Sequence, residues 1–429
     1  MGGMFETIRN AFKIPDLRRK MFITLMMLLV FRLGSHVPVP GMDPARLKDL
    51  AGSGTIFGFF DIVSGGAFSQ ATIFAMSITP YINSSIIMQL LTVAIPKLEQ
   101  LAKEGEEGRK IIARYTRYGT VILAFLQATG LYFGLRNAVS NPGVFAFFTV
   151  TLSFTAGTAF LMWLGEQITE YGIGNGISLL IFGGIVSRAP QGAWAIYYNY
   201  EMGKFGSKSI LGILGVATVL ALFLLVIALV VWIQEAERRI PVQYSKRVVG
   251  RKMYGGQSTH IPIKVNLAGV IPIIFAMSFI ALPSTLVSFF APNAQGPVWE
   301  YIRNMQQRVE ISILSGFLVM FFTFFYTLIQ FNPIELANNM KKNGGFIPGI
   351  RPGKPTSDYI TKVLNRITWF SAIFLALIQI MPAVLGAVTK IQGIWFAGTS
   401  LLILVGVALD TVKQVESQML MRHYKGFLE

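Results

Sequence analysis

Residues 55–96, TIFGFFDIVSGGAFSQATIFAMSITPYINSSIIMQLLTVAIP, contain two apolar segments of different kinds. The first, 55–69, is short and is interrupted by glycines and by Asp61. A helix needs about 20 apolar residues to cross a bilayer, so shorter runs re-enter the membrane or lie buried in protein. The second, 73–95, is long enough to cross, yet its middle carries Pro80, Asn83, Ser84, Ser85 and Gln89. Because polar groups are costly against lipid, we expect that face to line protein or a water-filled cavity.

The composition is that of a membrane protein. Hydrophobic residues make up 53% of the 429-residue chain and charged residues only 14%, which is too apolar for a soluble domain. The apolar residues come in blocks of about 20, as transmembrane helices require. We therefore predict an all-α polytopic membrane protein with ten spans, at 21–39, 73–95, 115–135, 144–164, 173–188, 210–233, 267–290, 311–331, 367–388 and 394–410.

The positive charges orient these spans. Most of the 37 Lys and Arg residues fall in alternate connections, namely 1–20, 96–118, 234–266, 332–366 and 411–429. Positive charge marks the cytoplasmic side, so we expect both termini to lie in the cytoplasm. We interpret 1–20 as an amphipathic cytoplasmic leader, because Arg32 interrupts the following apolar run and no cleavage site follows. The connection 165–172 is an exception, since it carries Glu166 and Glu170 but no Lys or Arg.

Ten spans divide into an N-terminal half, 21–188, and a C-terminal half, 210–410, joined by an external segment at 189–209. Inverted repeats of this kind place the working site at their interface near the middle of the membrane. We predict a cytoplasmic tail at 411–429.

The sequence lacks the residue patterns of an enzyme. There is no cysteine, and the three histidines are far apart in the sequence. Metalloprotease, phosphate-loop and Ser-His-Asp patterns are missing, and GIGNG at 172–176 follows a span, so we interpret it as a tight loop. We expect no catalytic residue, no metal site and no cofactor.

Two long cytoplasmic connections are the strongest candidates for a binding function. Topology alone explains their positive charge, but it does not explain lengths of about 30 residues, and long loops tend to be functional. In 234–266, Ile240, Val242 and Tyr244 alternate with other residues as in an exposed hairpin. We predict that 234–266 and 332–366 dock a large partner, such as ribosomal RNA or an acidic motor surface. The candidate contacts are Arg247, Arg251, Lys252, Arg351 and Lys354.

The chain resembles the SecY family, which forms the central subunit of the bacterial protein-conducting channel. The resemblance runs nearly end to end. It is carried by FRLGSHVPVPG (31–41), SGGAFSQATIFAMSITPYINSSIIMQLL (64–91), EGEEGRKIIARYTRYGT (104–120), FLMWLGEQITEYGIGNGIS (160–178), AERRIPVQYSKR (236–247), QSTHIPIKVNLAGVIPIIFA (257–276), FNPIELANNMKKNGGFIPGIRPG (331–353) and GTSLLI (398–403).

The resemblance implies a clamshell of two inverted five-helix halves around a central pore in the bacterial cytoplasmic membrane. The channel would translocate unfolded secretory polypeptides and release transmembrane segments sideways into lipid. The implied partners are the SecE and SecG subunits, the SecA motor ATPase, the ribosome, signal peptides and nascent polypeptides, and the lipid bilayer.

The resemblance also implies three site elements. A ring of aliphatic residues would form the pore constriction: Ile78, Ile82, Ile177, Ile181, Ile274 and Ile403. The pairs 78/82 and 177/181 each share one helix face. A plug half-helix would be seated below the constriction on the external side. It would comprise Thr55, Ile56, Phe57, Gly58, Phe59, Phe60, Asp61, Ile62, Val63, Ser64, Gly65 and Gly66. A lateral gate between 73–95 and 267–290 would include Asn83, Ser84, Ser85, Gln89, Ile274 and Met277.

A secondary transporter of a small solute is the alternative, suggested by ten spans and broken helices. Transporters coupled to ions or protons place several paired ionisable groups inside the membrane, and this chain places very few there. That scarcity and the two long basic loops favour the channel.

Overall fold

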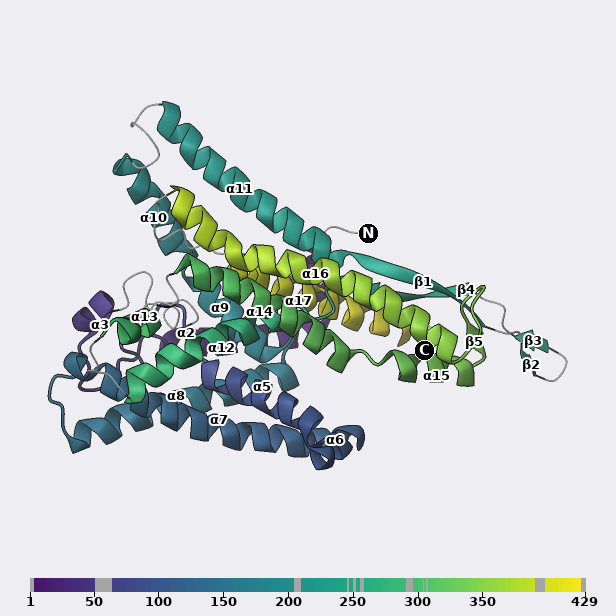
Figure 1. The fold of residues 1–429 in the computed structure, drawn as a ribbon, viewed down its shortest axis with the longest axis horizontal. Coiled ribbons are helices and arrows are strands. Elements are labelled where there is room, and N and C mark those ends of the chain that lie inside the picture. The colour runs from purple at the N-terminus through teal and green to yellow at the C-terminus, as the bar shows by residue number, and fades with distance from the viewer. Residues whose placement is uncertain are drawn as a thin grey trace. The chain divides into compact units, whose positions relative to one another are not determined.

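The computed structural model describes residues 4–50, 64–203, 210–244, 247–249, 252–254, 258–290, 296–303, 305, 308–389 and 398–425. The chain forms two compact units, and Figure 1 labels the helices and strands that they contain. The first unit comprises Met1–Ala217, Ser278–Ile311 and Thr389–Glu429, and the second comprises Thr218–Met277 and Ser312–Val388. We describe each unit by itself.

Helices build the first unit. They are α1 (Met4–Lys13), α2 (Pro15–Gly34), α3 (Pro44–Leu50), α5 (Thr79–Ala94), α6 (Pro96–Lys103), α7 (Glu106–Gly134), the short 3₁₀ helix η1 (Arg136–Ala138), α8 (Val144–Tyr171), α9 (Gly176–Ser187), α10 (Ala189–Glu201), α13 (Pro297–Arg303) and α17 (Gly398–Lys425). Several carry a proline at their first or second position, where its fixed φ suits the first helical turn and its missing N–H costs nothing.

Residues 64–78, called the turn segment below, are not helical although sequence analysis placed 73–78 inside a span. Helix α5 begins only at Thr79, with Pro80 in its first turn and Ala71 and Ser77 at positive φ before it. Other parts of the protein satisfy the backbone of this buried segment. The Val39 N–H donates to the Ala71 carbonyl (2.7 Å), and the Ile73 N–H donates to the Val37 carbonyl (3.0 Å). Non-helical backbone is tolerated at membrane depth only where protein or water provides such partners.

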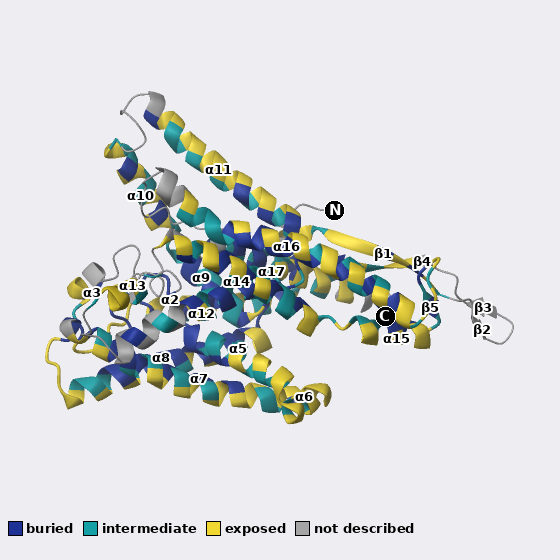
Figure 2. Ribbon diagram, viewed as in Figure 1, coloured by how far each residue is buried: buried dark blue, intermediate teal, exposed yellow. Residues whose placement is uncertain are grey.

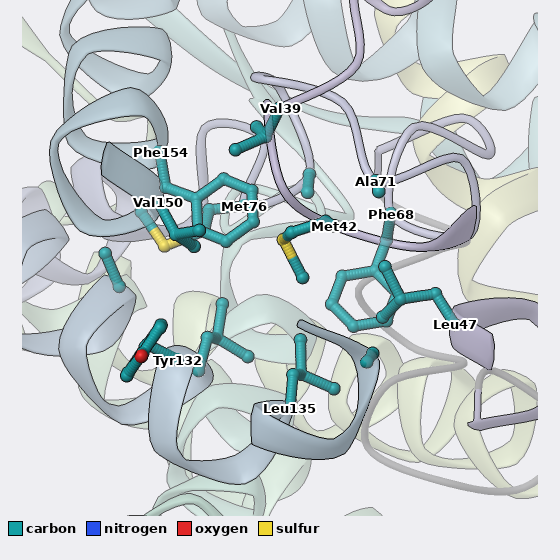
Figure 3. Close-up of a cluster of buried hydrophobic side chains, with 14 of the residues drawn as sticks. Val39, Met42, Leu47, Phe68, Ala71, Met76, Tyr132, Leu135, Val150 and Phe154 are labelled. Atoms are coloured by element: carbon teal, nitrogen blue, oxygen red, sulfur yellow. The ribbon is translucent and has the colours of Figure 1, made fainter. Parts of the chain in front are cut away.

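A buried hydrophobic cluster surrounds the turn segment. Phe68, Ala71 and Met76 from the segment pack against Tyr132 and other residues of α7, and against side chains from α8 and the stretch after α2 (Figure 3). Aromatic and aliphatic groups of this size supply most of the free energy of burial. The turn segment is therefore part of the core of the first unit.

The remaining helices of the first unit pack in sequence. Helix α5 lies on α7, α7 on α8, and α8 on α9, while α17 contacts both α9 and α1. Along α7, Ile122 and Leu126 remain exposed, and Figure 2 shows exposed stretches on this helix. An exposed apolar stripe on a long helix is what lipid contact requires.

The second unit combines long helices with a small sheet. It contains most of α11 (Ile210–Glu235), the first turns of α12 (Ile271–Phe290), most of α14 (Val309–Gln330), α15 (Pro333–Lys342) and nearly all of α16 (Lys354–Thr389). Between α11 and α12 lie β1 (Glu237–Tyr244), β2 (Arg247–Val249), β3 (Lys252–Tyr254) and β4 (Ser258–Lys264), and β5 (Gly345–Phe346) follows α15. A three-stranded antiparallel sheet has the order β4-β1-β5, and β2 pairs with β3.

Every predicted span contains a helix, although the bounds differ. Among the described residues, four helical stretches are long and apolar enough to cross a membrane: Val144–Tyr171, Gly212–Glu235, Glu310–Lys342 and Lys354–Val384. The count of ten spans and the division into halves at 189–209 stay predictions. Part of 189–209 is helical, as α10, which begins at Ala189 directly after its N-cap Arg188 and has Pro190 in its first turn.

Candidate pore constriction and docking loops

Four of the six residues predicted for the ring come together in the first unit. Ile78, Ile82, Ile177 and Ile403 belong to one hydrophobic cluster, called the aliphatic cluster below. Ile78 is fully buried, and the other three are half-buried. The cluster also receives Phe31, Phe74, Leu161, Leu164, Ile168, Leu179, Leu180 and Val407, from α2, the turn segment, α8, α9 and α17. Three helices far apart in the sequence thus bring their isoleucines to one place.

Local geometry explains how α5 presents its two residues. Ile78 is the N-cap of α5, and the Ile82 N–H donates to its carbonyl at 3.1 Å. The two side chains therefore lie one turn apart on the same face.

Close glycine contacts position α9. A Cβ on Gly176 would lie 1.9 Å from the Gly165 carbonyl oxygen, so only glycine allows α9 to begin this close to α8. Gly174 has φ +89°, and the side chain of Asn175 caps the helix by accepting from the Ser178 N–H. The tight loop predicted at 172–176 thus delivers Ile177 to the aliphatic cluster.

The remaining two ring candidates lie elsewhere. Ile181 is buried on α9 but is not among the residues of the aliphatic cluster. Ile274 is half-buried on α12, in the second unit. Its neighbour Phe275 packs edge-to-face on Phe322 of α14, with ring centroids 5.5 Å apart.

Most of the predicted plug, 55–63, lies outside the described residues. Its last three residues, Ser64, Gly65 and Gly66, begin the turn segment, and both glycines have positive φ. Gly65 lies against α9: the Ser187 hydroxyl donates to its carbonyl at 3.4 Å, and a Cβ there would lie 2.8 Å from the Gly184 carbonyl oxygen. The C-terminal end of the predicted plug is therefore fixed to α9.

The polar residues of α5 differ from one another in their surroundings. Ser84 is buried and donates a hydrogen bond of 2.8 Å to the Thr116 carbonyl on α7. A Cβ on Gly119 of α7 would lie 2.5 Å from its hydroxyl, so Ser84 occupies the α5–α7 contact. The buried Oδ1 of Asn83 has no hydrogen-bond partner among the described residues. Ser85 is half-buried and Gln89 exposed, and Met277 is half-buried on α12.

The two long loops form one structure in the second unit. Strand β1 pairs with β4 on one side and with β5 on the other, where Tyr244 lies opposite Gly345. Ile240 and Val242 are buried, which confirms the predicted alternation. They pack with Met340, Ile347 and other side chains of the second loop; the start of α16 contributes Ile360 and Leu364. We call β1, β4, β5, α15 and the start of α16 the hairpin body.

Four of the five predicted docking residues lie on or beyond this body. Arg351 and Lys354 are exposed at the beginning of α16, and the Arg351 carbonyl accepts a hydrogen bond from the Thr356 hydroxyl at 2.9 Å. Arg247 opens β2 and Lys252 opens β3, in the two-stranded ribbon at the far end of the hairpin. Arg251 lies outside the described residues.

Sequence analysis missed an ion pair between α7 and α8. Arg117 Nε lies 2.6 Å from Glu166 Oε1, with both side chains partly exposed. Glu166 was the residue that made 165–172 an exception to the charge rule, and its partner lies 49 positions earlier. The sequence offered one signal for this ion pair, namely that Glu166 has no basic neighbour in its own loop.

Comparisons with known proteins agree with this arrangement. The SecY family model matches residues 72–412. A protein translocase subunit SecY from Halalkalibacterium halodurans is 47% identical over 437 residues, which cover 99% of this chain and 100% of the relative. A solved protein conducting channel shares the fold over 94% of this chain and 92% of its own, with a TM-score of 0.65 at 19% identity. Sec61 in the canine ribosome-channel complex covers the same shares, with a TM-score of 0.59 at 17% identity.

Proposed function

We propose that this chain, which belongs to the SecY family, is the channel subunit of a protein translocase in the cytoplasmic membrane. It conducts unfolded secretory polypeptides across that membrane and releases transmembrane segments into lipid. The observation that carries this proposal is the aliphatic cluster, where isoleucines from α5, α9 and α17 meet.

The chemistry of the aliphatic cluster suits a seal. An apolar constriction excludes water and ions by dewetting, although no charge blocks the path. Aliphatic side chains also offer no directional bonds to a passing polypeptide. Ile78, Ile82, Ile177 and Ile403, joined by Ile181 and Ile274, would therefore close around different sequences without holding any of them.

The plug and the lateral gate complete the proposed channel. Residues 55–66 close the pore from the external side, and Gly65, fixed to α9, anchors the C-terminal end of the plug. The residues proposed for the lateral gate are Asn83, Ser84, Ser85, Gln89, Ile274 and Met277. Among them, Ser84 holds α5 to α7 through its hydroxyl, which donates to the Thr116 carbonyl.

The hairpin body is the proposed cytoplasmic docking surface. It presents Arg351 and Lys354 beside a three-stranded sheet, and Arg247 and Lys252 lie in the β2–β3 ribbon. Arg251 belongs to the same loop in the sequence. Arginine can bind carboxylate or phosphate with two parallel hydrogen bonds, which suits an acidic motor surface or ribosomal RNA. The partners are SecA, the ribosome, and the SecE and SecG subunits.

Reconstitution tests the proposed function. We expect vesicles containing the purified chain with SecE to take up an unfolded precursor when SecA and ATP are added, and to bind ribosomes in their absence. Uptake of a small solute driven by an ion gradient, without precursor translocation, would support the transporter alternative instead. Vesicles with SecE alone are the control for precursor that merely adheres to lipid.

A further inference from the structure

Asn266 occupies the junction between β4 and α12. Its side chain is 7% exposed and donates through Nδ2 to the Gly269 carbonyl at 3.2 Å. A carbonyl can only accept, so this bond fixes the amide orientation and leaves Oδ1 as an acceptor. Oδ1 accepts a hydrogen bond of 3.2 Å from the hydroxyl of Ser371 on α16, a residue 2% exposed. One buried amide therefore joins two segments 105 positions apart.

Helix α16 connects this bond to the hairpin body. Ile360 and Leu364 contribute to the core of that body, and both are fully buried. Ser371 follows Leu364 by seven residues on the same face, about 10 Å further along the helix at 1.5 Å per residue. A displacement of the beginning of α16 would thus reach Ser371 through continuous helix.

Asn266 also controls the start of α12. Its bond to Gly269 closes a turn in which Gly269 has φ +61°, and α12 begins two residues later. Ile273 and Phe275 are buried in the first helical turns of α12. The direction of the Asn266–Gly269 turn that precedes the helix therefore determines where Ile274 lies. The side chain thus fixes the first turns of α12 to α16.

We propose that Asn266 is a positioning residue that couples the hairpin body to α12. This inference rests on the proposed docking and gating functions. A partner that moves the beginning of α16 moves Ser371, and the buried hydrogen bond carries that movement to the turn before α12. Leaving the amide unpaired in the interior is unfavourable, so the bond is retained while the two helices move. Apolar contacts alone would allow α12 to slide.

A single fluorescent probe on α12 tests the coupling. The chain has no cysteine, so Phe279→Cys provides one labelling site for an environment-sensitive fluorophore. In vesicles with SecE, we compare the fluorescence change on SecA binding with and without Ser371→Ala or Asn266→Ala. Because each variant removes the hydrogen bond, we expect the change to fall about tenfold, while SecA affinity stays within about twofold.

Thr368→Val is the matched control. Thr368 is equally buried on α16, three residues before Ser371, but its hydroxyl donates to Leu364 of the same helix. This variant should respond like the parent. Ser371→Thr keeps a hydroxyl donor and should restore the response. The double variant Asn266→Ala with Ser371→Ala should lose no more than Asn266→Ala alone, because Asn266→Ala already removes the bond to Ser371.

A second double variant distinguishes a loss of folding from a loss of coupling. Asn266→Leu with Ser371→Ala replaces both side chains of this bond by apolar groups and leaves neither with an unpaired polar atom, so it should insert normally and still lose the response. A normal response in Ser371→Ala, or losses that add in the double variant, would overturn the inference and leave the proposed function standing. SecA binding to the parent chain without a fluorescence change would also overturn the inference, whereas absence of SecA binding would overturn the docking function, and the inference with it.

Discussion

The aliphatic cluster and the hairpin body are held together by different forces. In the cluster, Ile82, Ile177 and Ile403 meet through side-chain contacts that have no preferred direction. In the hairpin body, seven residue pairs join β1 to β4, and β5 adds two more. Such backbone hydrogen bonds fix a register, because a shift by one residue would turn Ile240 and Val242 away from the core. We infer that the cluster can open and close again, whereas the body keeps one shape for recognition.

The largest expected effect follows from the docking role of the body. We expect Arg351→Glu to lower SecA-driven translocation about 30-fold or more, since reversing a charge at a complementary contact costs about 2 kcal/mol or more. The variant should still insert, fold and keep the membrane sealed. Precursor uptake into vesicles, with protease mapping of the loops, measures both outcomes.

The control for Arg351→Glu is Lys362→Glu, which is exposed on α16 but outside the predicted docking residues. If translocation stays normal with normal topology, the docking role of Arg351 is wrong.

The next effect concerns the chemistry of the cluster. We expect Ile82→Asn or Ile403→Asn to raise the idle ion conductance about tenfold, because a polar side chain wets an apolar constriction. Export should also become less dependent on a good signal sequence. Single-channel recording and export of precursors with defective signals check these outcomes.

If the cluster works through apolar contact alone, its residues should tolerate a change of shape. We expect Ile403→Leu to change the conductance by less than about twofold, because swaps that conserve volume are well tolerated. Ile87→Asn, at an exposed position on α5, is a second control. A leak from either control as large as from Ile82→Asn would contradict the ring.

The body should be more sensitive to shape than the cluster. A Cβ on Gly345 would lie 2.9 Å from Cε1 of Tyr244 across the β1–β5 pair. We expect Gly345→Val to weaken ribosome binding about fivefold, since overpacking costs about 1–3 kcal/mol. Conductance should not change. Gly143→Ala is the control because its added Cβ meets open space; equal effects of the two variants would show that the pairing is unimportant.

The smallest effect on transport is expected from the plug. Deleting 57–63 removes no described contact of the aliphatic cluster, and Gly65 stays fixed to α9. Translocation should stay within about twofold, whereas the idle channel should open intermittently because its second barrier is gone. Loss of export or of folding would show that 57–63 belongs to the structural core.

Periodicity predicted elements where one face is buried and the other is not. The alternation of Ile240, Val242 and Tyr244 predicted β1 because a strand turns successive side chains to opposite faces. The pairing with β5 could not be predicted, because a strand of two residues, Gly345 and Phe346, is too short to show an alternation of buried and exposed side chains. For the same reason, the union of the two loops into one body came from the structure.

Polarity identified α5 as unusual but could not say what its polar face contacts. A serine that is kept from lipid can line water or bond to a neighbouring helix, and Ser84 does the second. The isoleucines pose the opposite problem, because an isoleucine in a membrane helix ordinarily just packs. Resemblance to a family selected Ile78, Ile82, Ile177 and Ile403, and the structure brings these four together. Ile181 and Ile274 stay predictions.

The turn segment constrains the order in which a ribosome-bound chain can be assembled into the membrane. Its Ala71 carbonyl depends on Val39, before the segment, but the carbonyl of Gly65 is bonded by Ser187, which is translated more than a hundred residues later. Until α9 has emerged, that end of the segment lacks its partner and is poorly suited to hydrocarbon. We expect the segment to wait at the aqueous boundary during synthesis and to enter the bilayer only when α8 and α9 arrive. Biogenesis of the first unit would then be completed late, in a single cooperative step.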